Sequence, residues 1–160
     1  MKIRVLGNGD LPALSEFIID AYKDYPLATW FELEPSPGEI ERIFYNKLRG
    51  IGSRTLVDVV TEGNDAIAGE CEVVKVGHDR GIVGIMVRKE YRGKHMGSDM
   101  LMLALEGAKE IGMARFTAEV AEENLDALRF FINNGFVPAE RRNIEKGKKS
   151  SRVVVMHREG

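Results

Sequence analysis

Residues 92–97, Arg-Gly-Lys-His-Met-Gly, place basic side chains and two glycines directly before a predicted helix. The free N–H groups at a helix start, together with the positive end of the helix dipole, bind anions. Gly93 and Gly97 allow close approach of the backbone to a ligand, and Arg88, Arg92 and Lys94 add charge for phosphates. The segment therefore predicts a diphosphate-binding loop, although a solvated turn between a strand and a helix has the same pattern.

The composition is typical of an ordinary globular chain. Its 160 residues fit a single domain spanning 1–160, and a net charge of -2 exerts no general attraction on nucleic acid. Cys71 has no second cysteine with which to form a disulfide, and no apolar run approaches the roughly 18 residues of a membrane span. Because the N-terminal residues lack the apolar core of a signal peptide, we expect a cytoplasmic protein.

The first half of the chain predicts a strand, two helices and an antiparallel meander. Asp10 is a candidate cap for the first helix, and Gly50 follows the second. Turn residues at 63–65 and 77–81 separate strand-like runs and predict hairpins. The expected elements are a strand at 3–5, helices at 11–22 and 40–48, and strands at 54–61, 67–76 and 82–87.

The second half predicts one parallel crossover. A helix at 98–111, opened by Ser98, is followed by a strand at 114–120 with period-two alternation. Because a helix separates it from the strand at 82–87, these two strands should be parallel neighbours. A helix at 124–134 and a last pair of strands from Phe136, joined near 146–149, complete the order βααβββαβαββ. This order predicts an α/β fold of the α+β type with a mixed, mainly antiparallel sheet.

Two segments resemble the GNAT superfamily of N-acetyltransferases. In the family's pyrophosphate loop, Arg or Gln is followed by two residues, Gly, one residue, and Gly or Ala. Arg92 and Gly97 match the ends of this pattern, whereas His95 stands at its first glycine. The segment NLDALRFFINNGF is similar to a later helix of the family, with matches at Asn124, Ala127, Phe131, Gly135 and Phe136. The order of elements is also similar over nearly the whole chain.

The resemblance implies a single GNAT-like domain whose parallel central strands splay to admit acetyl-CoA. The freed backbone groups would be unsatisfied without a ligand, which gives the splay a physical reason. Pantetheine would pair with Met86 and Val87, the loop would hold the pyrophosphate, and Asn124 would contact the pantetheine arm. The expected cofactor-binding residues are Met86, Val87, Arg92, Gly93, Lys94, His95, Met96, Gly97, Ser98, Asn124 and Phe131, and no metal is expected.

Two catalytic groups of many relatives are replaced in this chain. Phe131 stands where a tyrosine donates a proton to the leaving thiolate, and Gly81 stands where some relatives carry a glutamate base. Water, Ser98 or Tyr91 could replace the acid, although Tyr91 also fits a plain surface aromatic. Glu70 and Glu72 lie on one face of the preceding strand and remain candidate bases, as do His78 and Asp79 in the turn, and we take Glu72 first. That face could instead be solvated, and His78 and Asp79 fit ordinary turn residues.

The residues before position 42 predict the acceptor side. Acidic residues outnumber basic ones between 10 and 41, where the family places its acceptor wall, so a cationic amine could be attracted there, although solvated helix faces explain the pattern too. Trp30 and Phe31 could line that wall or anchor it to the core. Without a strong base, an α-amine is favoured over a lysine amine, because near pH 7 roughly a tenth of it is neutral against about 0.04%.

We therefore expect a direct N-acetyltransferase that takes acetyl-CoA and the primary amine of a small molecule or a protein N-terminus. No nucleic-acid or membrane partner is expected, and a homodimer is left open. The alternative on the same fold is a non-catalytic acyl-CoA-binding module or sensor. A nucleotide-binding phosphate loop is disfavoured because no Gly-Lys-Ser/Thr pattern follows the strand.

Overall fold

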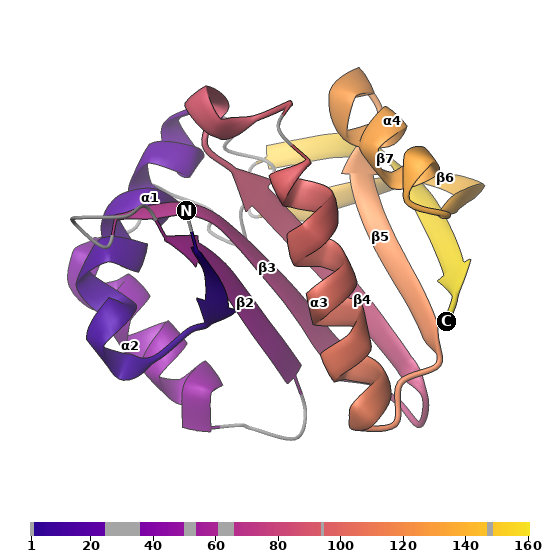
Figure 1. Cartoon of the computed structure of the whole chain (residues 1–160). Helices are drawn as coiled ribbons and strands as arrows, with labels where there is room; N and C mark the ends of the chain where they lie inside the picture. The colour runs from indigo at the N-terminus through magenta and orange to yellow at the C-terminus, as the bar shows by residue number, and fades with distance from the viewer. Residues whose placement is uncertain (1, 25–35, 50–53, 61–65, 94, 147–148) are drawn as a thin grey trace.

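Seven strands form one mixed sheet in the order β1-β2-β3-β4-β5-β7-β6 (Figure 1). The computed structural model describes residues 2–24, 36–49, 54–60, 66–93, 95–146 and 149–160. The strands are β1 (Lys2–Val5), β2 (Arg54–Val60), β3 (Ile67–Val76), β4 (Arg80–Val87), β5 (Arg115–Ala121), β6 (Val137–Lys146) and β7 (Lys149–Glu159). The helices are η1 (Asn8–Asp10), α1 (Leu11–Asp24), α2 (Pro37–Arg49), η3 (Lys89–Tyr91), α3 (Met96–Glu110) and α4 (Leu125–Asn133). The predicted order of elements and the α+β class are confirmed.

Helices cover both faces of the sheet. One core cluster joins α3 and α4 to inward side chains of β3, β4, β5 and β7, whereas a second joins α1 and α2 to Ile67. In Figure 1, α3 crosses the front of the sheet, and α1 and α2 lie at its other side. Cys71 and Val73 of β3 belong to the α3 cluster, so the alternating residues Glu70 and Glu72 face the side of α1 and α2. None of the described helices has both the length and the apolar character needed to cross a membrane.

The parallel strands β4 and β5 pair over only part of their length. Arg80 to Val83 pair with Arg115 to Ala118, and beyond Val83 and Ala118 the described residues of the two strands have no further pairing with each other. Past that point β4 remains bonded to β3 and β5 remains bonded to β7. Figure 1 shows the two strands diverging from this end toward α4. The predicted splay of the central strands is thus confirmed.

The C-terminal strand lies inside the sheet. β7 pairs antiparallel with β5 on one side and with β6 on the other, so β6 is the edge strand. The four residues Val153 to Met156 are all buried, as expected for a strand that is covered on both faces. β5 is therefore held in place by β7 where it has left β4.

Asp10 ties β1 to the start of α1. Its carboxylate accepts two hydrogen bonds from the guanidinium of Arg4, of which the Nη1–Oδ2 bond is 2.5 Å long, and a third from the Gly7 N–H at 2.8 Å. Asp10 is thus not the N-terminal cap predicted for α1; its carboxylate instead accepts the N–H of Gly7, three residues earlier in the chain. The Arg4 guanidinium lowers the pKa of the Asp10 carboxyl below its ordinary value of 3.8; burial opposes this effect, and the Gly7 N–H adds to it.

We predict that Asp10→Asn destabilises the fold at neutral pH by about 1–2 kcal/mol, because it removes the charge that binds Arg4. A lowered folded-state pKa means that this contribution is complete above about pH 5 and is lost as the pH falls through the folded-state value, below 3.8. Urea denaturation of the wild type and the variant at about pH 7 and about pH 3 measures the difference. A difference that stays constant between these pH values would contradict a role for the charge.

Candidate active site

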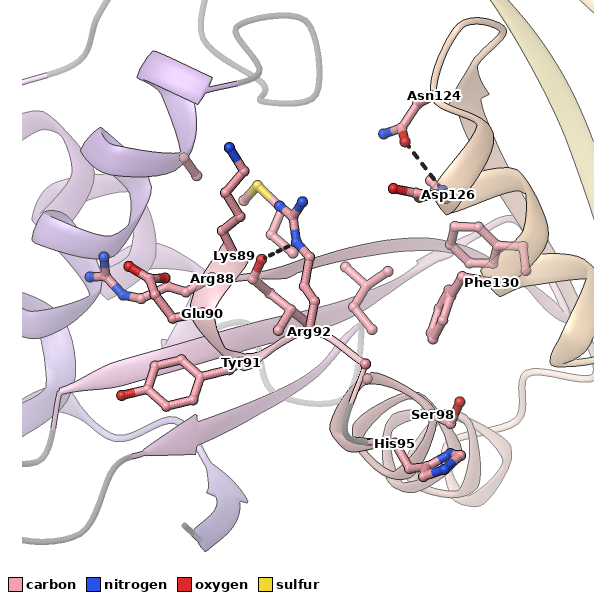
Figure 2. A pocket seen from close by; sticks show the side chains of 18 of the residues that line it. Arg88, Lys89, Glu90, Tyr91, Arg92, His95, Ser98, Asn124, Asp126 and Phe130 are labelled. Atoms are coloured by element: carbon pink, nitrogen blue, oxygen red, sulfur yellow. Dashed lines mark hydrogen bonds between the residues drawn. The ribbon is translucent and has the colours of Figure 1, made fainter.

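A cavity of about 720 Å³ opens at the end of the sheet where β4 and β5 diverge. β4 and η3 form one wall, α4 with its N-cap forms the opposite wall, and α1 and the start of α3 form the rims. In Figure 2, Lys89 and Arg92 face Asn124, Asp126 and Phe130 across this space. Of the predicted cofactor residues, the cavity is lined by Met86, Val87, Arg92, Gly93, His95, Gly97, Ser98, Asn124 and Phe131.

The strand wall offers backbone groups and the opposite wall offers an amide. From Gly84 to Val87 the described residues of β4 pair with β3 alone, so the backbone N–H and C=O groups on the other edge face the gap. Asn124 is the N-cap of α4, and its Oδ1 accepts the Ala127 N–H at 3.2 Å. This bond orients the remaining NH₂ of Asn124 toward the cavity (Figure 2). The two walls thus present hydrogen-bonding groups at both sides of the gap.

The start of α3 supplies donors for an anion. Its first N–H groups, from Met96 onward, have no carbonyl partner within the helix. Ser98 lies inside the first turn and is not the cap, because the helix begins two residues earlier than predicted. The Ser98 hydroxyl accepts a 3.1 Å hydrogen bond from Asn134 Nδ2, which links α3 to the end of α4. The Met96 side chain is buried in the core, so a role for this residue in ligand binding would rest on its backbone.

Basic side chains and a close approach complete the anion-binding side. Arg92 Nε donates to the Val87 carbonyl at 3.0 Å, which aligns the guanidinium along the cavity (Figure 2). A Cβ on Gly97 would lie 3.1 Å from the Phe130 ring, so the absence of a side chain leaves room at this point. Lys94 lies outside the described residues. The backbone edge and the cationic helix start fit the amides and the diphosphate of a phosphopantetheine nucleotide.

His95 has a backbone conformation that favours glycine. It is the N-cap of α3 with φ 60° and ψ 3°, in the left-handed region, and its side chain is exposed at the cavity. The position is the one at which the family loop has its first glycine. The structure therefore keeps the glycine-like backbone of the loop while adding an imidazole (Figure 2).

Phe131 is part of an aromatic cluster and has no proton to donate. Its ring is 5% exposed and packs edge-to-face on Phe130 and Phe136, with centroids 5.3 Å and 5.0 Å away. Both Phe130 and Phe131 line the cavity. The position of the missing tyrosine is thus an apolar surface beside the gap.

The packing around Gly81 leaves no room for the glutamate that some relatives carry at this position. A Cβ at this position would lie 2.6 Å from Met113 Sδ and 2.8 Å from Val73 Cγ1, on the face covered by α3. No side chain fits there without movement of the core. This position therefore cannot supply a general base.

Two carboxylates flank the point where β4 and β5 part, on the face opposite α3. Glu72 pairs in register with Gly84, the first β4 residue past the parallel pairing, and Glu119 is the first such residue of β5. A Cβ on Gly84 would meet nothing within 4 Å, so open space lies between the two side chains. Glu72 bonds to Lys47 of α2 at 2.7 Å, and Glu119 forms an ion pair with Arg142 of β6. Neither carboxylate is among the described residues that line the cavity.

Sequence reasoning missed Glu119, although its signal was present. The alternation of Phe116, Ala118 and Val120 with the polar residues Arg115, Thr117 and Glu119 indicates both the strand and its polar face. A charged side chain on the polar face of a strand predicted to splay is a stronger signal. Glu70 is 4% exposed and lies on the same face as Glu72.

The other predicted residues are divided between the two ends of β4. Tyr91 lines the cavity, whereas Asp79 lies in the turn before β4 and bonds to Arg115 at 2.8 Å, at the end away from the loop. That pairing lowers the pKa of Asp79. His78 is an exposed residue of the same turn. Of the acidic residues predicted on the acceptor side, Asp20 lines the cavity. Trp30, Phe31, Glu32 and Glu34 lie outside the described residues.

Comparison with known proteins identifies the family and the fold. A model of the acetyltransferase (GNAT) family matches residues 16–136. A ribosomal-protein-alanine N-acetyltransferase from Brucella melitensis has a TM-score of 0.85 at 20% identity over 100% of both chains. A phosphinothricin acetyltransferase from Sinorhizobium meliloti, in complex with AcCoA, has a TM-score of 0.82 at 18% identity over 99% of this chain and 87% of that chain. A spermidine N-acetyltransferase variant from Vibrio cholerae has a TM-score of 0.76 at 22% identity over 99% and 95%. No curated protein matches the sequence significantly.

We predict that His95→Gly is more stable than His95→Ala by about 1 kcal/mol, because alanine retains the cost of the left-handed backbone and glycine does not. Thermal and urea denaturation of the two variants and the wild type measure this difference. Equal stabilities of the glycine and alanine variants would contradict the assigned backbone conformation.

Proposed function

Because the chain belongs to the acetyltransferase (GNAT) family and acetyl-CoA is the cosubstrate of that family, we propose that it transfers acetyl directly to the primary amine of a small molecule or a protein N-terminus. The names of the three similar proteins refer to a ribosomal-protein alanine, phosphinothricin and spermidine. The shared fold therefore does not determine which amine accepts the acetyl group. The acceptor class must therefore be argued from this chain's own residues.

The observation that carries the proposal is the gap between β4 and β5. Its backbone edge from Gly84 to Val87 would bond the pantetheine amides, with Asn124 on the opposite side. The start of α3, with His95, Gly97 and Ser98, would hold the pyrophosphate. A ligand pairing with the strand edge would satisfy backbone groups that are otherwise exposed in the gap.

The two flanking carboxylates give the amine a binding place. An ammonium ion that enters over Gly84 would lie between Glu72 and Glu119, on the face away from α3. Lys47 of α2 and Arg142 of β6 pair with these carboxylates from opposite sides. Either carboxylate could accept the amine's proton directly or through one water, and we favour Glu119 because its side chain is 24% exposed against 8% for Glu72.

The leaving group needs little help from the protein. Acetyl-CoA supplies a thioester, and thiols are acidic enough (free cysteine has a pKa of about 8.5) for a thiolate to depart without a strong acid. This is consistent with Phe131 in place of a tyrosine. Positioning in the gap and backbone N–H groups of β4 would then provide most of the acceleration.

We predict that Arg92→Ala weakens acetyl-CoA binding roughly tenfold, because it removes a charged donor to phosphate at the mouth of the cavity. Isothermal titration calorimetry with acetyl-CoA measures this affinity. Arg129→Ala is the matched control, since Arg129 is exposed on α4 and does not line the cavity. Equal affinities of the two variants would contradict the placement of the phosphates.

Turnover distinguishes the enzyme from a sensor. Free thiol released from acetyl-CoA is measured across a panel of α-amines, polyamines and peptide N-termini. Sustained release with at least one amine supports the proposed transfer. Stoichiometric binding without release across the whole panel would favour an acyl-CoA sensor, and failure to bind acetyl-CoA would exclude both.

We predict that Glu119→Gln lowers kcat/KM for the amine by about 10²–10⁴-fold, the usual range for loss of a general base. The loss should shrink at high pH, where more of the amine is already neutral, and acetyl-CoA affinity should change little. Steady-state kinetics over a pH series, with calorimetry alongside, tests this.

Glu122→Gln is the matched control, because Glu122 also pairs with arginines, Arg141 and Arg152, but lies beyond the end of β5. Glu72→Gln measured in parallel assigns the role between the two flanking carboxylates. If Glu119→Gln behaves as Glu122→Gln does and Glu72→Gln shows the large loss, the base is Glu72.

A further inference from the structure

Arg88 joins three elements at the rim of the cavity. It follows the last residue of β4, and its backbone N–H donates to the Ala68 carbonyl at 2.8 Å. Its side-chain Nε donates to the Ile67 carbonyl at 2.7 Å, and Nη1 donates to Asp20 Oδ2 of α1, also at 2.7 Å. One residue therefore bonds the start of β3 and the last turns of α1 to the end of β4.

The surroundings of Arg88 favour a fixed geometry. Its side chain is 22% exposed, and the guanidinium lies 5.3 Å from the centre of the buried Phe17 ring. A planar guanidinium can serve a carbonyl, a carboxylate and a ring face at the same time, whereas the point charge of lysine cannot. Bonds between charged partners are also shorter and stronger than neutral ones.

Arg88 and its partners on α1 belong to the cavity. Phe17, Asp20 and Ala21 line it from α1, while the residues directly after Arg88 line it from η3. In Figure 2, Arg88 points toward the helix whereas Lys89 points in a different direction. The sequence predicts Arg88 as a charge for the phosphates, but its guanidinium is bonded to β3 and α1 instead.

We propose that Arg88 is a positioning residue that fixes α1 against β4 and so sets the acceptor-side wall of the cavity. This inference rests on the proposed transfer reaction, in which β4 carries the cofactor and α1 borders the acceptor. Loss of the anchor should leave cofactor binding intact and weaken acceptor binding. Asp20 acts through Arg88 in this arrangement, so the two residues should behave as one unit.

The test compares Arg88→Ala, Arg88→Lys and Asp20→Asn with a matched control, Arg115→Ala. The control removes an arginine–aspartate bond of similar length, 2.8 Å to Asp79, at the far end of β4. Three quantities are measured: acetyl-CoA affinity by calorimetry, KM and kcat for the best amine of the panel, and hydrogen exchange of the amides in α1.

For Arg88→Ala we expect KM for the amine to rise roughly tenfold, with acetyl-CoA affinity changed by less than about twofold. Amides in the last two turns of α1 should exchange about tenfold faster than in the wild type. Arg88→Lys should recover part of both effects, because an ammonium can reach Asp20 but cannot also bond Ile67 and cover Phe17. The control should match the wild type in all three measurements.

Asp20→Asn should reproduce much of the Arg88→Ala effect, and the double variant should add little to it. Unchanged exchange in α1 and unchanged KM would overturn the inference, as would a loss of acetyl-CoA affinity as large as the rise in KM. If Arg88→Ala does not fold, Arg88→Lys and Asp20→Asn decide by the same criteria. If the wild type binds acetyl-CoA but acetylates no amine, the proposed function fails, and exchange in α1 alone decides whether Arg88 positions the helix.

Discussion

The early end of the β4–β5 pairing is the constraint on which the site depends. A parallel pair that ran the full length of both strands would satisfy its own backbone groups and leave no room for a ligand. Here β3 pairs with the outer edge of β4 and β7 pairs with the outer edge of β5, so the pairing of the sheet itself maintains the gap. The α3 start and the α4 cap then meet at the open end because each follows one of the diverging strands.

The same register organises the opposite face. At the closed end of the gap, alternation turns Val83 and Ala118 toward α3 and turns Gly84 and Glu119 away from it. Glu72 enters the same row from β3, and cations from α2 and β6 hold the two carboxylates. Gly81 and Gly84 lie on opposite faces of β4. The close packing around Gly81 and the open space over Gly84 follow from this, because only the first of these faces is covered by the α3 cluster.

Local patterns predicted the order of elements and the parallel pair, and most of the cofactor residues that the family resemblance implied do line the cavity. The position of β7 between β5 and β6 was not predicted, although the apolar run Val153–Met156 beside the polar β6 is typical of an interior strand next to an edge. Partners such as Lys47 for Glu72 and Asp20 for Arg88 could not be predicted, because they lie 25 and 68 residues apart and leave no periodic signal. The left-handed backbone of His95 could not be predicted from local preference, because residues other than glycine rarely adopt a positive φ.

The interior place of β7 also bears on how the molecule forms during synthesis. Only four residue pairs join β5 to β4, and the rest of β5 is bonded to a strand that is made some thirty residues later, at a ribosomal rate of about 5–20 residues per second. The β5 side of the gap therefore cannot be completed on the nascent chain until residues 149–159 have left the ribosome. Until then one edge of β5 lacks its partner strand, and an unpaired strand edge exposes the chain to misassembly or to capture by a chaperone.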